Sequence, residues 1–164
     1  MTTIEILKTL IAFPTISADS NRKLVDYCSD QLIKVGAEVK ILKNDKSTKA
    51  NLFATVGPRN ILGVLLSGHT DVVPIEGQSW TVPAFEMTKK NNKIYGRGTD
   101  DMKSFLACAL HTALKASHMN LTTPLHLALS YDEEIGCVGV RSMIEMLKKA
   151  PFVPLFCIVG EPTL

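Results

Sequence analysis

The stretch Ile61-Leu62-Gly63-Val64-Leu65-Leu66-Ser67-Gly68-His69-Thr70-Asp71 joins an apolar run to a histidine and a carboxylate. Its first six residues are nearly all Ile, Leu or Val, which is typical of a strand buried on both faces. Side chains alternate along an extended chain, so His69 and Asp71 lean the same way if the extension continues past Leu66. The stretch therefore predicts a central strand with polar side chains at its carboxyl end.

Helices and further strands are predicted on both sides of this stretch. Apolar periodicity predicts helices over 4–13, 23–35, 104–117 and 138–149, with Thr3 capping the first and Ser20 or Asn21 the second. Further strands are predicted over 37–43, 51–56, 125–131 and 155–159, and a hairpin over 85–88 and 93–95. This alternation predicts a three-layer α/β/α sandwich with a mostly parallel mixed sheet. The sequence ends at Leu164 without a closing helix, so we expect a fold that is incomplete at the C-terminus.

Composition favours one ordinary globular domain and excludes several classes of partner. The 164 residues are 46% apolar and 21% charged, and the net charge is +2. This charge gives no reason to expect nucleic acid or an anionic membrane as a partner. The lysines at 40, 43, 46 and 49 are separated by other residues and are expected to lie in a solvated turn. No signal peptide or membrane-length apolar run is present, and four scattered cysteines favour free thiols over disulfides. We therefore expect a cytoplasmic protein.

Carboxylates recur in four motifs, each at the end of a predicted strand or at a glycine-rich bend. The motifs are Gly68-His69-Thr70-Asp71, Asp100-Asp101-Met102-Lys103, Asp132-Glu133-Glu134 and Gly160-Glu161-Pro162-Thr163. In open α/β sheets ligands bind outside the carboxyl ends of the strands, so side chains far apart in sequence can converge there. Three carboxylates and one histidine suit Zn²⁺, with Co²⁺ or Mn²⁺ as possible substitutes. The motifs together predict a two-metal amidohydrolase.

Residues in these motifs could serve as metal ligands, as a group that orients a ligand and as a general base. His69 can bind a metal while Asp71 orients the imidazole through its second nitrogen. One of Glu133 and Glu134 can bind metal while the other stays free as a general base. Glu161 directly follows the apolar run 155–159, again at a strand end.

Each motif taken alone also has a simpler explanation. His69 could be a loop histidine bonded to a nearby carboxylate. Asp100 and Asp101 precede a predicted helix, where acidic residues serve as caps and favour the helix dipole. Glu133 and Glu134 could be ordinary surface charge. Three other histidines have weaker claims to a site: His111, His118 and His126. It is the recurrence at strand ends that favours the metal site.

Taken together, the motifs closely resemble those of the dinuclear zinc M20 peptidase and deacylase family, which includes acetylornithine deacetylase and succinyl-diaminopimelate desuccinylase. The resemblance rests on residues 67–74, 95–103, 130–137 and 159–163, which occur in the family's order along the chain. Residues 77–80 and 130–137 are more similar to the deacetylase than to the desuccinylase. The resemblance implies hydrolysis of N2-acetyl-L-ornithine to ornithine and acetate, a step in arginine biosynthesis. A related deacylase and a truncated metal-binding module without turnover are the alternatives.

The resemblance also implies a role for each residue of the motifs. His69, Asp101 and Glu161 would bind one zinc, and Asp101 would bridge to a second zinc held by Glu134. Asp71 would support His69. Glu133 would take a proton from the bridging water and deliver it to the leaving amine. Asp100 occupies a variable position and is left out of the ligand set.

Two departures from the family pattern bear on activity. Ser104 stands where the family usually has glycine, and it could crowd the start of the helix or cap it. The family's lid and dimerisation domain, and a late histidine of the second metal site, have no counterpart in residues 1–164. We therefore expect an N-terminal part of the catalytic domain that is weakly active or inactive alone, and a homodimeric full-length enzyme.

Overall fold

A five-stranded mixed sheet forms the centre of the protein in the computed structural model, which describes residues 1–59, 61–150 and 154–162. The strand order is β1-β2-β6-β3-β7, with bounds β1 Glu38–Lys43, β2 Ala50–Val56, β3 Val64–His69, β6 Leu125–Ser130 and β7 Phe156–Val159. A separate hairpin pairs β4 Thr88–Lys90 with β5 Lys93–Tyr95. Thr163, the last residue of the fourth motif, and Leu164 lie outside the described residues.

The pairing of the strands decides where the motifs meet. β1, β2 and β6 pair antiparallel, whereas β3 pairs parallel with both β6 and β7. The register places His69 beside Ser130 and Ser67 beside Val159. The carboxyl ends of β3, β6 and β7 therefore lie at one edge of the sheet, as the strand-end argument requires.

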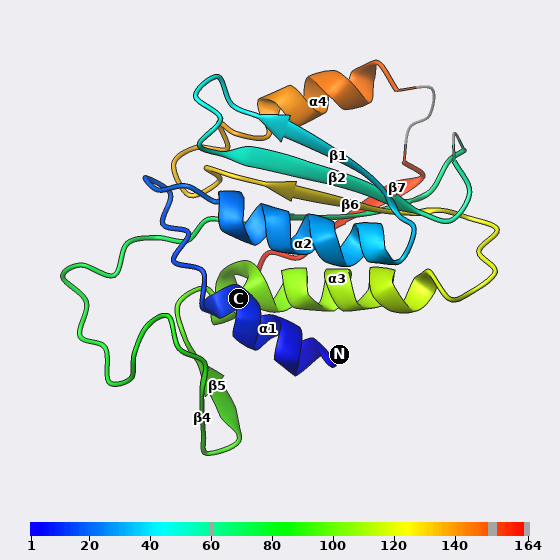
Figure 1. The fold of residues 1–164 in the computed structure, drawn as a ribbon. Helices are drawn as coiled ribbons and strands as arrows, with labels where there is room; N and C mark the ends of the chain where they lie inside the picture. The colour runs from blue at the N-terminus through cyan, green and yellow to red at the C-terminus, as the bar shows by residue number, and fades with distance from the viewer. Residues whose placement is uncertain (60, 151–153, 163–164) are drawn as a thin grey trace.

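Helices cover both faces of the sheet (Figure 1). One side carries α2 (Arg22–Lys34) and α3 (Ser104–Ala116), with α1 (Thr3–Ile11) packed against α3; the other carries α4 (Arg141–Lys148). The larger apolar core fills the space between the sheet and the first three helices, with Leu24, Leu110 and Leu127 fully or almost fully buried. A smaller cluster joins Met143 of α4 to Phe53, Leu65 and Ala128 of the sheet. The prediction of an α/β sandwich with a mixed sheet is confirmed.

The first two helices begin slightly earlier than the sequence suggests. Thr2, not Thr3, caps α1: its hydroxyl accepts the Glu5 N–H while the Glu5 carboxylate accepts the Thr2 N–H. Asn21 is the cap residue of α2, but its side chain makes no capping bond and instead binds Ala50 and Thr70. The two helices end at Ile11 and Lys34, two and one residues before the expected positions.

The central strand is displaced relative to the prediction of 61–66. It begins at Val64 and continues to His69, while Ile61 and Leu62 are exposed. The strand begins where pairing begins: the Val64 N–H donates to Pro124 O, and the Leu155 N–H donates to Gly63 O. His69 is consequently the last residue of the strand rather than part of a loop.

The remaining differences are at element boundaries. β4 covers 88–90 rather than 85–88, because the chain turns only at Asn91 and Asn92, both with positive φ. α4 begins at Arg141 rather than Val138. An irregular turn, Thr99–Lys103, precedes α3, and Asp101 and Met102 in it have non-helical backbone angles. The acidic pair is therefore not simply the first turn of a helix.

The four cysteines of the described chain are free thiols, as predicted. Cys28 is buried in the main core, whereas the other three are exposed. In the part of the chain that the structure describes, no helix combines the length and apolar character needed to span a membrane.

Candidate metal site

His69 lies at the centre of the candidate site, at the end of β3, with 1% of its side chain exposed. Its Nδ1 lies 2.9 Å from the backbone oxygen of Asp71. A carbonyl oxygen can only accept, so Nδ1 carries a proton and Nε2 is the nitrogen that faces the site. This arrangement differs from the sequence expectation in one detail, because the backbone of Asp71 makes this hydrogen bond while its carboxylate stands 3.5 Å from Nδ1.

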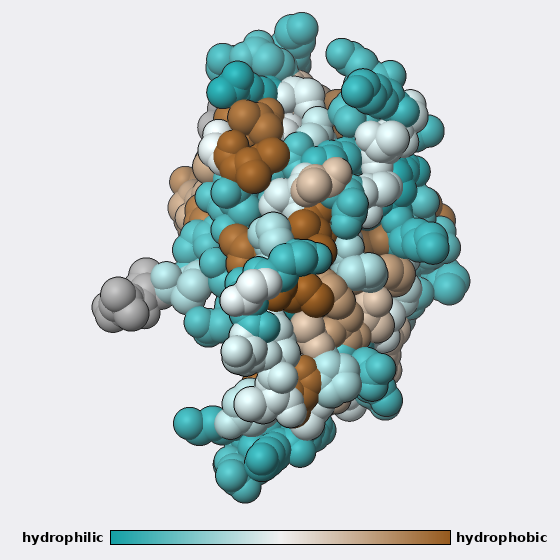
Figure 2. All heavy atoms as spheres, turned by 90° about the vertical axis from the view of Figure 1, so that its left-hand side faces the viewer, coloured by the Kyte–Doolittle hydropathy of each residue, from teal (hydrophilic) through white to brown (hydrophobic). Residues whose placement is uncertain are grey.

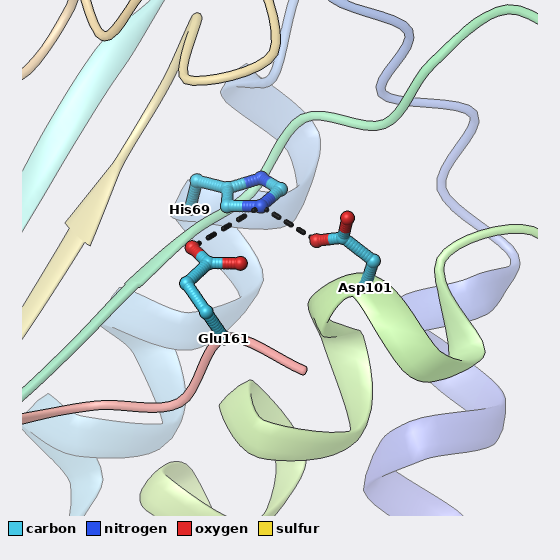
Figure 3. A group of neighbouring side chains, drawn as sticks. All are labelled: His69, Asp101 and Glu161. Carbon is cyan, nitrogen blue, oxygen red and sulfur yellow. Dashed lines mark hydrogen bonds and ion pairs between the residues drawn. The ribbon is translucent and has the colours of Figure 1, made fainter. Parts of the chain in front are cut away.

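Two carboxylates approach the free side of this imidazole (Figure 3). Asp101, from the turn before α3, places Oδ1 2.9 Å from Nε2, and Glu161, from the segment after β7, places Oε1 3.7 Å from it. One ligand atom from each of these three residues lies within 4.8 Å of the other two. One imidazole nitrogen and two carboxylate oxygens form a donor set that suits a divalent transition-metal ion.

Glu133 and Glu134 follow β6 and lie beside this group. Glu133 Oε2 is 3.8 Å from His69 Nε2, and its Oε1 accepts a hydrogen bond from the Cys137 thiol at 3.3 Å. Cys137 is exposed. Within the described residues Glu134 is not part of the three-residue metal group, but its half-buried carboxyl is close enough for the charges of Asp101 and His69 to affect its pKa.

The Asp71 carboxylate hydrogen-bonds to several of the groups around the site. This buried carboxylate accepts the Ser17 hydroxyl at 2.7 Å and the backbone N–H groups of Glu133 and Glu134 at 3.1 and 3.3 Å. Burial alone would raise the pKa of Asp71, but the nearby His69 ring and the hydrogen bonds from Ser17 and Glu133 lower it below its usual value. Asp71 therefore carries a negative charge in contact with both the histidine and the glutamate turn.

The electrostatics of the site show an excess of negative charge around one imidazole. Burial alone would lower the pKa of His69, but Asp71, Glu161 and Asp101 together raise it to about 9. The pKa of Glu161 is raised by burial and by its neighbours Asp101 and Glu133, and that of Glu134 by burial and by Asp101. Carboxylates that resist ionisation beside one another are the arrangement that a bound cation relieves. The residues present therefore fit a divalent metal.

A model of the peptidase family M20/M25/M40 matches residues 65–164. The chain belongs to this family. The resemblance inferred from the four motifs is thus confirmed, and the divalent metal that the donor set suits agrees with it.

Curated relatives of this M20 chain extend the match to nearly its whole length. It is 37% identical to the acetylornithine deacetylase of Photorhabdus laumondii over 98% of this chain and 42% of that protein. It is also 37% identical to the acetylornithine deacetylase of Proteus mirabilis, over 99% of this chain and 43% of that protein. The chain therefore spans less than half the length of these relatives. That residues 1–164 form the N-terminal part of a catalytic domain stays a prediction.

Solved structures of similar fold include a metallo-carboxypeptidase and a dipeptidase. The chain matches the M20 family metallo-carboxypeptidase Sso-CP2 from Sulfolobus solfataricus with a TM-score of 0.83 and 24% identity. It matches human carnosine dipeptidase 1 with a TM-score of 0.82 and 21% identity. Each match covers 99% of this chain and 38% of the other. At these identities the likeness shows the fold.

A cavity of about 240 Å³ opens beside the M20 site. Its wall includes His69, Glu133 and Glu161 together with the apolar side chains of Val140 and Val159. The face of the molecule toward this sheet edge carries apolar side chains between polar ones (Figure 2). Polar groups at the edge of a partly apolar hollow are the usual setting of a small-molecule site.

The weaker histidine candidates lie elsewhere. His126 is buried within β6, where Nδ1 is 3.0 Å from the Thr55 hydroxyl and the ring stacks on Phe53. His111 is half-buried on α3, and His118 is exposed after it. Asp100 is exposed beside Asp101. None of these four belongs to the metal group found among the described residues.

Sequence reasoning missed two residues next to the site, Ser17 and Lys49. Ser17 contacts Asp71 directly, and its segment is held to Val72 by an isolated parallel bridge between Ile16 and Val72. Lys49 was expected in a solvated turn, but its ammonium group donates to Asp132 and to the backbone oxygen of Ser17. The solvated-turn prediction is therefore wrong for Lys49. The only signal in the sequence was weak: Lys49 lies two positions before the predicted strand 51–56.

Proposed function

We propose that the protein to which this chain belongs is a zinc-dependent amidohydrolase that converts N2-acetyl-L-ornithine to L-ornithine and acetate. The observation that carries the proposal is the convergence of His69, Asp101 and Glu161, with Glu133 beside the same imidazole nitrogen. The substrate is suggested by curated acetylornithine deacetylases, which are 34–37% identical across nearly the whole of this chain.

In this proposal the metal ligands are the residues that the motifs suggest. His69, Asp101 and Glu161 would hold one zinc, and Asp101 would be shared with a second zinc held by Glu134; Co²⁺ could replace zinc. When bound, the metals would polarise the amide carbonyl and lower the pKa of a water molecule. Since this chain supplies only Asp101 and Glu134 to the second position, residues 1–164 alone would be weakly active or inactive.

Glu133 is the proposed general base and then general acid. Its carboxylate accepts a proton from the attacking water as the new C–O bond forms, and returns it to the amine nitrogen as the C–N bond breaks. The Glu133 carboxylate is about one third exposed and lines the cavity, so it can reach a bound substrate. The backbone N–H groups of Glu133 and Glu134 are held by Asp71, which fixes the start of both side chains.

Asp71 acts through the residues that it holds. The backbone oxygen of Asp71 keeps the proton of His69 on Nδ1, so that Nε2 can offer its lone pair to a cation. The negative carboxylate nearby increases the basicity of the imidazole. Both effects strengthen the binding of a cation.

A Glu133→Gln substitution in the complete zinc-loaded protein tests the proposal. Gln cannot accept the proton, so kcat should fall by about 10²- to 10⁴-fold while zinc content is unchanged. The matched control is Glu86→Gln, an exposed glutamate away from the site, which should behave as the unsubstituted protein. Retained turnover in Glu133→Gln would show that another group is the base.

A substrate panel distinguishes the alternatives. The preferred substrate should be N2-acetyl-L-ornithine over N-succinyl-diaminopimelate and other N-acyl amino acids. Preference for another acyl group would make the protein a related deacylase. Zinc binding without hydrolysis of any of them would favour a metal-binding module. Dimer formation by the complete protein stays a prediction that mass measurement in solution would check.

A further inference from the structure

The two glutamates of the site stand on a segment, residues 131–140, that belongs to neither β6 nor α4. Backbone hydrogen bonds within the segment form a tight turn: the N–H groups of Gly136 and Cys137 both donate to Glu133 O at 2.9 Å. Asp132 and Cys137 in it have positive φ, a conformation that non-glycine residues adopt only when their surroundings hold it. The position of Glu133 therefore depends on contacts from elsewhere in the chain.

Lys49, the residue just before β2, makes such a contact. Its ammonium group is 2.5 Å from Asp132 Oδ1, and the two side chains are 13% and 12% exposed. The same ammonium donates to the backbone oxygen of Ser17. Since the Ser17 hydroxyl donates to Asp71, one cation links the two segments that flank the Asp71 carboxylate.

The backbone next to Lys49 is itself fixed by hydrogen bonds. Asn21 forms two hydrogen bonds with the backbone of Ala50, of 2.8 and 2.9 Å, and a third with the Thr70 hydroxyl next to His69. Asn51, two residues after Lys49, donates to Gly139 O at 2.8 Å, near the other end of the glutamate segment. The start of β2 thus contacts this segment at both ends, and Lys49 is the contact adjacent to Glu133.

The energetics of the ion pair favour a role in placement over one in stability. A largely buried lysine–aspartate pair adds little net stability compared with apolar residues, because desolvation offsets the attraction. It is, however, specific in geometry, and here it holds the residue immediately before Glu133. Displacing a reacting group by about 1 Å can reduce a rate by about 100-fold.

We propose that Lys49 is a positioning residue: by binding Asp132 and Ser17 O together, it holds the Glu133–Glu134 turn against Asp71. The inference concerning catalysis rests on the proposed function, since it assumes that Glu133 is the general base. The placement of the turn can be tested without that assumption.

The direct test is hydrogen exchange in the complete metal-free protein with Lys49→Met, compared with Lys46→Met, an exposed lysine in the same turn between β1 and β2. The amide protons of Glu133 and Glu134, which are hydrogen-bonded to the Asp71 carboxylate, should exchange at least about tenfold faster in Lys49→Met than in Lys46→Met. The amide protons of β6 should keep their protection in both variants. Equal protection of the two glutamate amides in both variants would overturn the proposal. So would a uniform loss that includes β6, because it would indicate general destabilisation.

A double-mutant cycle tests the route through Asp132. In the zinc-loaded protein, Lys49→Met and Asp132→Asn should each lower kcat by about 10- to 100-fold, as supporting residues of metal sites do, with KM little changed. If both act through one contact, the double variant should be no worse than the poorer single variant; multiplied losses would overturn the proposal. If the unsubstituted protein hydrolyses no substrate, the proposed function fails, and hydrogen exchange still decides the role of Lys49 in placement.

Discussion

The carboxylate of Asp71 accepts the backbone N–H of Glu133 at 3.1 Å across a sequence separation of 62 residues. The same carboxylate also lies 3.5 Å from His69 Nδ1. One buried anion therefore connects the histidine at the end of β3 with the glutamate turn after β6. The strand register brings them together, because His69 and Ser130 are partners in the parallel pair of β3 and β6.

An Asp71→Asn substitution should weaken the whole site. A side-chain amide has one acceptor oxygen and an NH₂ group that only donates, so it cannot accept from Ser17, Glu133 and Glu134 together. We expect zinc affinity and kcat each to fall by about 10- to 100-fold. Chelator competition and steady-state kinetics measure the two effects. Asp30→Asn, at an exposed position of α2, is the control, and an Asp71 variant that matched it would refute the connecting role of Asp71.

Much of the site could be predicted because its residues follow apolar runs. His69, Glu133 and Glu161 all occur at or after the ends of strands, and parallel neighbours bring such ends to one edge. Asp101 was found by its motif rather than by its place on a strand. Its turn has irregular backbone angles that no hydrophobic pattern predicts.

Contacts between residues far apart in the sequence could not be predicted. The apolar run 61–66 gives no indication that pairing begins only at Val64, since Ile61 and Leu62 are as apolar as the residues that pair. Lys49 resembles the other lysines near it, and its burial depends on the approach of Asp132 from 83 residues away. Long-range contacts of this kind leave no local periodicity in the sequence.

Zinc affinity should depend on pH through His69. The pKa of this imidazole is raised from 6.5 to about 9 in the metal-free protein, and a metal binds only the unprotonated nitrogen. Below about pH 9 zinc must displace a proton, so its affinity should rise by up to about tenfold per pH unit as the pH approaches 9 and then level off.

Competition with a chelator across that range measures the slope, and calorimetry in buffers of different ionisation enthalpy measures the proton released. A variant at the exposed His118, His118→Ala, should keep the full dependence. An affinity that does not change between about pH 6.5 and about pH 9 would show that His69 is not protonated in the metal-free protein.

Lys103 should give the protein a distinct pH dependence of stability. Its side chain is fully buried beneath the turn that carries Asp101, and Nζ donates to Phe13 O at 2.7 Å. Burial lowers its pKa from 10.5 to about 7. Between these values the unfolded chain holds a proton that the folded protein does not, so the free energy of unfolding should rise with pH, by up to about 1.4 kcal/mol per pH unit.

A Lys103→Met substitution removes this titration at nearly constant side-chain length. Phe13 O keeps a partner, because the Thr15 N–H also donates to it at 2.8 Å. Urea unfolding at several pH values should therefore show the unsubstituted protein gaining stability relative to Lys103→Met between about pH 7 and pH 10.5. Lys115→Met, at an exposed position of α3, should leave the pH profile unchanged. Parallel profiles for Lys103→Met and the unsubstituted protein would mean that Lys103 stays charged in the fold, which would require a counter-charge near Nζ.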